Sequence, residues 1–282
     1  MAPSASRLAL FANYRNRLLR YSDPTISLPN NRMVATGRNI EKLRATFHGV
    51  APENIAFVPL DVTNEAQAKA AVDAATKRFG RIDVLVNNAG YSLLGNFEQM
   101  TTTEIQAQFA TNFYGVVHLM QAALPVMRRQ KSGHVINISS VAGVVGMKHC
   151  AAYAATKFAL EGLSLSVATE VEKFGIKITV VEPGFFRTDF LDSSHVRWAD
   201  KAIEDYAAEI NAQDMLSPYH GNQPGDPAKL GDALLKISAM QNPPKVFVAG
   251  SDALGMITPA VEERLQMIRA NETLTKSTDG SF

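Results

Sequence analysis

A tyrosine and a lysine stand one helical turn apart in the segment "YAATK", which runs from Tyr153 to Lys157. Side chains at positions i and i+4 of a helix share a face, and an ammonium beside a phenol favours the phenolate. We therefore expect the pKa of Tyr153 to be lowered, which would suit this residue to general acid–base catalysis. The alternative is a surface pair on an amphipathic helix, because a chain with seven tyrosines can show this spacing by chance.

Two other polar residues could complete such a site. Ser140 ends the segment "HVINISS", a predicted buried strand, and its hydroxyl could orient a carbonyl and stabilise developing negative charge. A serine that only caps a turn is the better interpretation of Ser139. Asn112 lies inside a predicted helix over 101–130, where asparagine is mildly unfavourable. Its alternative is a side chain that points to solvent.

Short apolar strands alternate with helical segments from about residue 33 onwards. We predict strands at 33–36, 55–62, 82–90, 134–140, 176–184 and 245–250, and helices at 39–47, 65–79, 101–130 and 150–173, with a last helix opened by Asp226-Pro227. The strands are continuously apolar, as in a parallel sheet buried on both faces. This order predicts an α/β fold with a doubly wound parallel sheet, whose ligands bind at the carboxyl ends of the strands.

Composition narrows the function classes. The net charge is +1, which gives no electrostatic reason to expect a nucleic-acid partner. Histidine and cysteine show no metal-ligand spacing, and no apolar run reaches the roughly 20 residues of a transmembrane segment. The single cysteine, Cys150, excludes an intramolecular disulfide and fits a reducing compartment, so we expect a cytoplasmic protein. Mitochondrial import is the alternative, because residues 1–20 are rich in arginine and lack acids.

Five separated motifs occur at predicted strand ends or helix starts. They are "NNAG" at 87–90, "TNFYG" with its asparagine at 112, "ISS" at 138–140, "YAATK" at 153–157 and "EPGFFRT" at 182–188. Together they resemble the short-chain dehydrogenase/reductase family, and in particular its hydroxysteroid- and retinol-dehydrogenase-like subgroup. The resemblance covers roughly residues 32–250. It implies one Rossmann-like domain over 1–282, a substrate lid over 189–225, and a homodimer or homotetramer.

The resemblance also implies roles for residues. Tyr153 would transfer a proton to or from the substrate oxygen, Lys157 would also bind the nicotinamide ribose, and the backbone of Asn112 would hold a relay water; Ser140 completes this catalytic set. The residues that would bind the cofactor are Arg38, Asp61, Val62, Asn88, Ala89, Gly90, Tyr153, Lys157, Pro183, Gly184 and Thr188. A guanidinium suits the 2′-phosphate of NADP, and the chain has no acid between Arg38 and Glu41. We therefore expect NADP, with NAD as the less favoured alternative.

One element of the family pattern is missing. The family begins with a strand and a glycine-rich turn against the cofactor pyrophosphate, but the corresponding strand "LALF" (8–11) leads into "ANYRNRL", and residues 1–36 contain no glycine. The segment 1–31 could be a degenerate turn, or a presequence fused to a shortened domain. It could also be a reading-frame artefact, because codons for residues 16–21 read one base later can spell Thr-Ala-Ser-Ser-Gly-Ile.

The function expected from these observations is NADP-dependent interconversion of a secondary alcohol and a ketone on a small apolar substrate. A catalytically silent relative that has lost cofactor binding is the alternative, and an NAD-linked enzyme is a third. We expect His149 and Cys150 to line the pocket. Aromatic and apolar residues could form a lid or belong to the core: Phe185, Phe186, Phe190, Trp198 and Met215. The apolar positions near 254–268 are expected to pack as a helix.

Overall fold

Seven parallel strands form the central sheet of the protein. The structure, a computed structural model, describes residues 8–12, 32–47, 49–192 and 195–280. The strands are β1 (Leu8–Ala12), β2 (Arg32–Gly37), β3 (Ile55–Pro59), β4 (Val84–Asn87), β6 (Gly133–Ile138), β7 (Ile176–Pro183) and β9 (Val246–Ala249). Their order across the sheet is β3-β2-β1-β4-β6-β7-β9. From β1 the chain therefore builds the sheet outward to β3 on one side, and from β4 it builds it outward to β9 on the other. The prediction of a doubly wound parallel sheet is confirmed, and so is a strand at 8–11.

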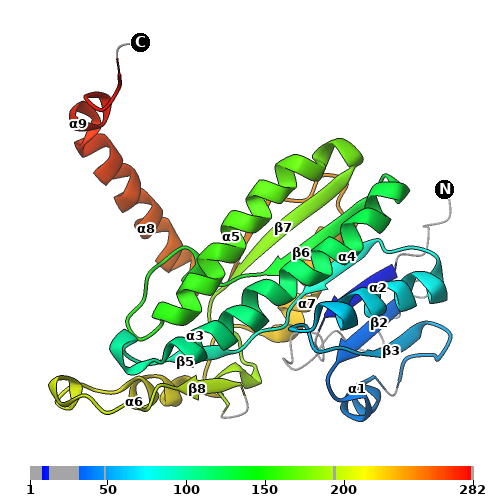
Figure 1. Ribbon diagram of the computed structural model, residues 1–282, viewed down its shortest axis with the longest axis horizontal. Helices are drawn as coiled ribbons and strands as arrows, with labels where there is room; N and C mark the ends of the chain where they lie inside the picture. The colour runs from blue at the N-terminus through cyan, green and yellow to red at the C-terminus, as the bar shows by residue number, and fades with distance from the viewer. Residues whose placement is uncertain (1–7, 13–31, 48, 193–194, 281–282) are drawn as a thin grey trace.

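Helices cover both faces of this sheet. They are α1 (Ile40–Thr46), α2 (Glu65–Phe79), α3 (Thr102–Phe109), α4 (Gly115–Gln130), α5 (Ala151–Val171), α6 (Ala212–Leu216), α7 (Pro227–Ala239), α8 (Ser251–Ala270) and α9 (Glu272–Lys276). In Figure 1 α2, α4 and α5 lie side by side in front of the sheet, and α7 lies behind it. The layered arrangement leaves the carboxyl ends of the strands free to build a site.

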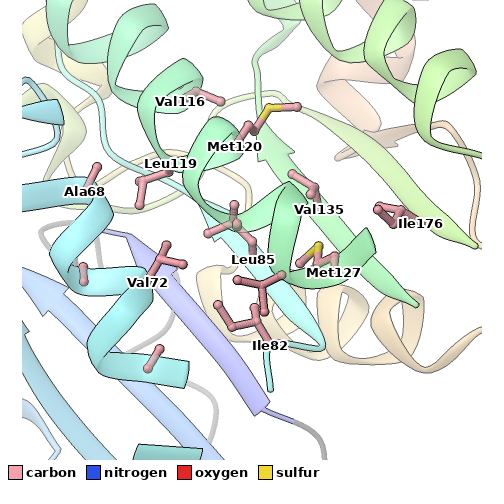
Figure 2. Packing of buried hydrophobic residues seen from close by; sticks show 14 of the residues in the cluster. Ala68, Val72, Ile82, Leu85, Val116, Leu119, Met120, Met127, Val135 and Ile176 are labelled. Atoms are coloured by element: carbon pink, nitrogen blue, oxygen red, sulfur yellow. The ribbon is translucent and has the colours of Figure 1, made fainter. Parts of the chain in front are cut away.

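Alternate residues of the central strands serve the two faces. Leu85 packs with α2 and α4, whereas its neighbours Val84 and Val86 pack with Leu230 and Leu234 of α7. This alternation follows from the period of two residues in a strand. Figure 2 shows the α2–α4 side of the core, where Val72 and Leu119 lie near Leu85. Both faces are apolar because both are buried, as the continuous apolar pattern predicted.

Local signals set the helix boundaries where the structure agrees with the prediction. The helix α2 covers 65–79, and Gly80 ends it in the left-handed conformation with φ of 83°. Thr101 and Glu104 form the reciprocal capping box at the start of α3. The prediction of one continuous helix over 101–130 is wrong, because residues 110–114 form a π-helical turn between α3 and α4. Such turns widen a helix and are frequent at functional sites.

The region 189–225 contains short elements rather than a long helix. The strand β8 (Val196–Trp198) pairs in parallel with β5 (Ser92–Leu94) in a second, two-stranded sheet. The short helix α6 follows, and the segment returns to the main sheet beside α7. This second sheet was not predicted. Among the described residues, no helix is long and apolar enough to cross a membrane.

Candidate active site

A cavity of about 260 Å³ lies where β4, β6 and β7 end. Its walls come from the strand ends, from α5 and from the region after Thr188. The lining residues are Asn88, Gly90, Ser92, Leu94, Ile138, Ser139, Ser140, Val141, Met147, Lys148, Cys150, Tyr153, Lys157, Pro183, Gly184, Phe185, Phe186, Thr188, Phe190, Leu191, Met215, Leu216 and Gln223. The cavity is therefore mainly apolar, with polar groups among its lining residues.

The helix α5 places Tyr153 and Lys157 on the same wall of this cavity. Both side chains are buried, at 8% and 6% exposure. The Lys157 ammonium lies 5.6 Å from the centroid of the Tyr153 ring and donates a hydrogen bond of 2.7 Å to the carbonyl of Ile138. The Tyr153 ring also packs against Phe190, with 5.5 Å between ring centroids. The arrangement excludes the alternative of an exposed surface pair.

The expected lowering of the Tyr153 pKa is wrong for this structure. Burial raises the pKa of Tyr153 above its usual range, and a hydrogen bond with Ser140 only partly opposes that rise. The ammonium of Lys157 is held by the carbonyl of Ile138 rather than by the phenol oxygen. Tyr153 is consequently protonated at pH 7.

Ser140 stands at the junction between β6 and a short 3-10 turn. Its hydroxyl accepts a hydrogen bond of 3.1 Å from the backbone N–H of Ala142, and the side chain is buried. The turn fixes the hydroxyl beside the phenol of Tyr153. The hydroxyl therefore both caps a turn and faces the cavity, so the structural and the chemical interpretations of this serine are compatible.

Asn112 belongs to the π-helical turn and is completely buried. Its amide donates to the carbonyl of Tyr91 at 2.9 Å and to the hydroxyl of Thr156 at 3.2 Å, and its oxygen accepts from the N–H of Tyr91 at 3.2 Å. The solvent-facing alternative is thus wrong. These bonds fix the loop after β4, where a Cβ on Gly90 would lie 3.3 Å from the Asn112 oxygen and 4.0 Å from the ammonium of Lys157.

The comparisons with known proteins agree with this geometry. The family described as "short chain dehydrogenase" matches residues 27–197. The chain belongs to the short-chain dehydrogenase family. Oxidoreductase BOA17 of Botryotinia fuckeliana is 37% identical over 231 residues, which cover 82% of this chain and 84% of that protein. This short-chain dehydrogenase is therefore an oxidoreductase.

Two solved structures extend the comparison. A short-chain dehydrogenase from Streptomyces avermitilis is 31% identical, with a TM-score of 0.86 over 98% of this chain and 100% of that one. ElxO, solved with NADP bound, is 28% identical, with a TM-score of 0.72 over 89% of this chain and 99% of that one. The likeness to the Streptomyces structure includes nearly the whole chain, so the fold after residue 197 is shared as well.

The short-chain dehydrogenase carries a third polar group on the same helix face as Tyr153 and Lys157. Glu161 stands one turn beyond Lys157 and is 9% exposed. Burial lowers the pKa of Lys157 to about 8, and the Glu161 carboxylate opposes that fall. Burial also raises the pKa of Glu161 to about 7; the nearby Ser139 hydroxyl and Lys157 lower it, whereas Glu182 of β7 raises it. Tyr153, Lys157 and Glu161 therefore follow one another along one buried face of α5.

The residues expected at the adenosine end lie after β2 and β3. Arg38 follows β2 directly and is exposed. Asp61 follows β3 and accepts hydrogen bonds from the N–H and hydroxyl of Thr63. Burial raises the pKa of Asp61, but the bonds from Thr63 and the charge of Arg38 lower it overall. Val62 packs on the α4 backbone, where a Cβ on Gly115 would lie 2.7 Å from it.

Three of the predicted residues lie around the end of β7. Pro183 ends β7, and Gly184 follows with its N–H bonded to Ala249. A Cβ on Gly184 would collide with the carboxylate of Asp252, so this position requires glycine. The Thr188 hydroxyl accepts from the N–H of Phe190 at 3.3 Å and faces the cavity.

Most of the residues that could form a lid or belong to the core line the cavity. Phe185, Phe186, Phe190 and Met215 line the cavity, whereas Trp198 packs in a neighbouring apolar cluster with Leu94. Cys150 lines the cavity as expected. The same expectation for His149 is wrong, because this residue turns away in a left-handed backbone conformation with φ of 63°.

Sequence reasoning missed two polar residues. Glu161 had a detectable signal, since it continues the i, i+4 spacing of Tyr153 and Lys157. Gln223 had none, because it lies in an irregular loop that reaches the cavity only through the fold. It is 1% exposed, and its side-chain oxygen has no hydrogen-bond partner within the described part of the chain.

The described residues fit a dinucleotide on the nicotinamide side. The buried amide nitrogen of Asn88 has no partner among the described residues and borders the cavity, so a donor is available to a polar ligand. Gly90 and the adjoining Ala89 bring backbone close to the Lys157 ammonium. The glycine-free turn predicted for the pyrophosphate begins at Ala12. The rest of it falls within 13–31, outside the described residues.

Proposed function

We propose that the protein is an NADP-dependent reductase that converts a ketone on a small apolar substrate to a secondary alcohol, with Tyr153 as the proton donor. The observation that carries this proposal is the convergence of Ser140, Tyr153 and Lys157 on one wall of an apolar cavity. When bound, the nicotinamide supplies the hydride. The phenol of Tyr153 is protonated at neutral pH, so it can donate a proton to an alkoxide as it forms.

Each polar group in the cavity has a part in the proposed reaction. The Ser140 hydroxyl would hold the substrate carbonyl oxygen beside the Tyr153 phenol and stabilise its negative charge. The Lys157 ammonium would bind the cofactor ribose and favour the phenolate that remains after proton transfer. Asn112 would hold the Gly90 loop in place through Tyr91. The apolar walls would exclude water and accept the body of the substrate.

A fluorescence titration with NADPH tests the proposal. The protein should be full length with a verified N-terminus, and an NADPH-consumption assay against apolar ketones should follow. Micromolar binding with turnover supports the reductase. A catalytically silent relative remains the second candidate because residues 1–36 lack glycine; it would show no binding at millimolar NADPH.

The charge of Arg38 should determine the choice of cofactor. Arg38 follows β2, beside Asp61, where a guanidinium can bind a 2′-phosphate. Replacement by aspartate should weaken NADPH about 10- to 100-fold, as expected for a lost charge-assisted hydrogen bond, and weaken NADH far less. The measurement is the ratio of kcat/KM for the two cofactors, with Arg129→Asp on the end of α4 as a control of equal charge. An unchanged ratio would favour the NAD-linked alternative.

Glu161 should set the alkaline limit of the reaction. Its carboxylate raises the pKa of the buried Lys157, so Glu161→Gln lets the ammonium lose its proton at a lower pH. The alkaline limb of log kcat/KM against pH should therefore move to lower pH in this variant. The exposed Glu172→Gln is the control and should keep the wild-type profile. A shift to higher pH, or none, would show that Glu161 does not act through Lys157.

A further inference from the structure

The second half of α8 has no packing partner within the described chain. Ala253 and Ile257, near its start, are buried against the body of the protein, but every residue over 261–280 is exposed. In Figure 1 the helix, drawn in red, extends away from the sheet and its covering helices. The helix expected near 254–268 is present as α8, but its residues beyond Ala260 are exposed in this chain.

A helix in this position needs a partner for its stability. Short isolated helices are marginal in water, and most helical stability in proteins comes from packing of an apolar face. Gly255 and Pro259 weaken the intrinsic helix propensity of α8 further. The exposed segment thus has neither the sequence of a strong isolated helix nor a surface of its own chain to pack against.

The exposed apolar side chains follow a heptad pattern. Leu254, Val261 and Ile268 are spaced by seven residues, and Leu265 lies four after Val261 and three before Ile268. They are 58%, 51%, 59% and 45% exposed, respectively. Thr258 occupies the remaining position of the pattern. Spacings of three and four place these residues along one narrow stripe, which is the seam of a coiled coil.

The charges beside the stripe favour a protein over an anionic membrane. Residues 251–272 contain four acidic and two basic residues, whereas helices that lie on anionic lipid are rich in lysine and arginine. Glu262 and Arg269 are seven residues apart and flank one side of the stripe, and Arg264 flanks the other. The same side of the helix therefore carries one charge of each sign, an arrangement that is complementary to an inverted copy of itself.

We propose that α8 pairs in antiparallel orientation with α8 of a second copy of this chain, along the end of the stripe formed by Val261, Leu265 and Ile268. In this orientation the residues that flank one side of the stripe face the residues on the same side of the partner helix. Glu262 therefore lies across from Arg269 of the partner subunit. A parallel pair would place Arg264 against Arg269 of the partner subunit, which is repulsive. The contact is isologous and closes a twofold dimer. It is independent of the proposed reaction.

Mass measurement tests whether the stripe holds the copies together. Light scattering after size exclusion should give an oligomer for the wild type and a smaller assembly for the double variant Leu265→Glu with Ile268→Glu. Both residues are exposed in the single chain, so its folding should be preserved. Gln266→Glu, away from the stripe, should leave the mass unchanged. A monomeric wild type, or an equal mass for wild type and double variant, would overturn the proposal.

Cross-linking tests the orientation. Glu262→Cys combined with Arg269→Cys should give a covalent dimer on mild oxidation. The two cysteines cannot bridge within one helix, since seven residues span about 10 Å, and the native Cys150 is buried. Glu263→Cys with Ala270→Cys, on the opposite face, should remain uncross-linked. Absence of a dimer in the first variant, or co-sedimentation of a monomer with phosphatidylserine vesicles that Leu265→Glu abolishes, would reject the pairing.

Discussion

Replacing Tyr153 with phenylalanine is expected to lower turnover about 10²- to 10⁴-fold, the contribution of a positioned proton donor. The substitution removes only the hydroxyl. The ring that packs 5.5 Å from Phe190 remains, and so does the apolar surface buried in the wall of the cavity. Folding and NADPH affinity should therefore change little, and the loss should appear in kcat rather than in binding.

The reason for this large effect is the protonation state of the phenol. Burial raises the pKa of Tyr153, so the hydroxyl is protonated across the neutral range within a mainly apolar cavity. The hydroxyl of Ser140 can hold a carbonyl but has no comparable acidity. Loss of the phenol hydroxyl consequently leaves the developing alkoxide without a nearby acid.

The measurement is single-turnover oxidation of NADPH under saturating ketone, together with the fluorescence titration. Tyr206→Phe is the matched control, because the Tyr206 hydroxyl is exposed, bonds to Glu98 and does not line the cavity. That control should retain wild-type turnover. If the Tyr153 variant retained it as well, the proton would have to come from another group and the proposed role would be lost.

The sequence allowed prediction of those elements whose signals are local. The helix α2 matched its prediction from 65 to 79 because Asn64 caps its start and Gly80 ends it. The buried strands were recognisable because both faces of the sheet are covered, which makes their sequences continuously apolar. The strand at 8–11 could be placed only through the family resemblance, since its neighbours β2 and β4 come later in the chain.

Features that depend on distant contacts were not predictable. The π-helical turn interrupts the helix, although the apolar period of the sequence continues through it. In this turn Asn112 bonds to the backbone of Tyr91, in another part of the fold. The strands β5 and β8 are three residues each and pair across widely separated segments. Neither leaves a periodic signal. The raised pKa of Tyr153 was also missed, since spacing reveals the neighbouring cation but not the depth of burial.

The apolar pattern of α8 shows a different limit. Leu265 and Ile268 have the spacing of core-facing residues, and the pattern alone cannot distinguish a core inside one chain from a contact between chains. Only their exposure in the folded chain separates the two cases. For the candidate site, in contrast, ligands of a doubly wound sheet bind at the carboxyl ends of its strands. The sequence therefore predicted one shared site for Ser140 and Gly184, and both line the cavity.

Replacing Lys157 with methionine is expected to affect both binding and turnover. The ammonium holds the carbonyl of Ile138 at 2.7 Å and lies near the Tyr153 ring and the Gly90 backbone. Loss of a charge-assisted hydrogen bond to the cofactor ribose should raise the dissociation constant of NADPH about 10- to 100-fold. Turnover should fall at least about 10²-fold, because the phenolate formed by proton transfer loses its neighbouring cation.

The paired effect separates this lysine from a residue that only maintains the fold. Methionine keeps the length of the side chain and suits the buried position, although the Ile138 carbonyl loses its donor at a cost of about 1–3 kcal/mol. Removal of the cation should also raise the pKa of Glu161 further, because Lys157 lowers it. The exposed Lys245→Met is the control for loss of one charge. A Lys157 variant with weakened stability but normal NADPH affinity and kcat would show that the ammonium supports β6 alone, and the row from Tyr153 to Glu161 would then have no part in proton transfer.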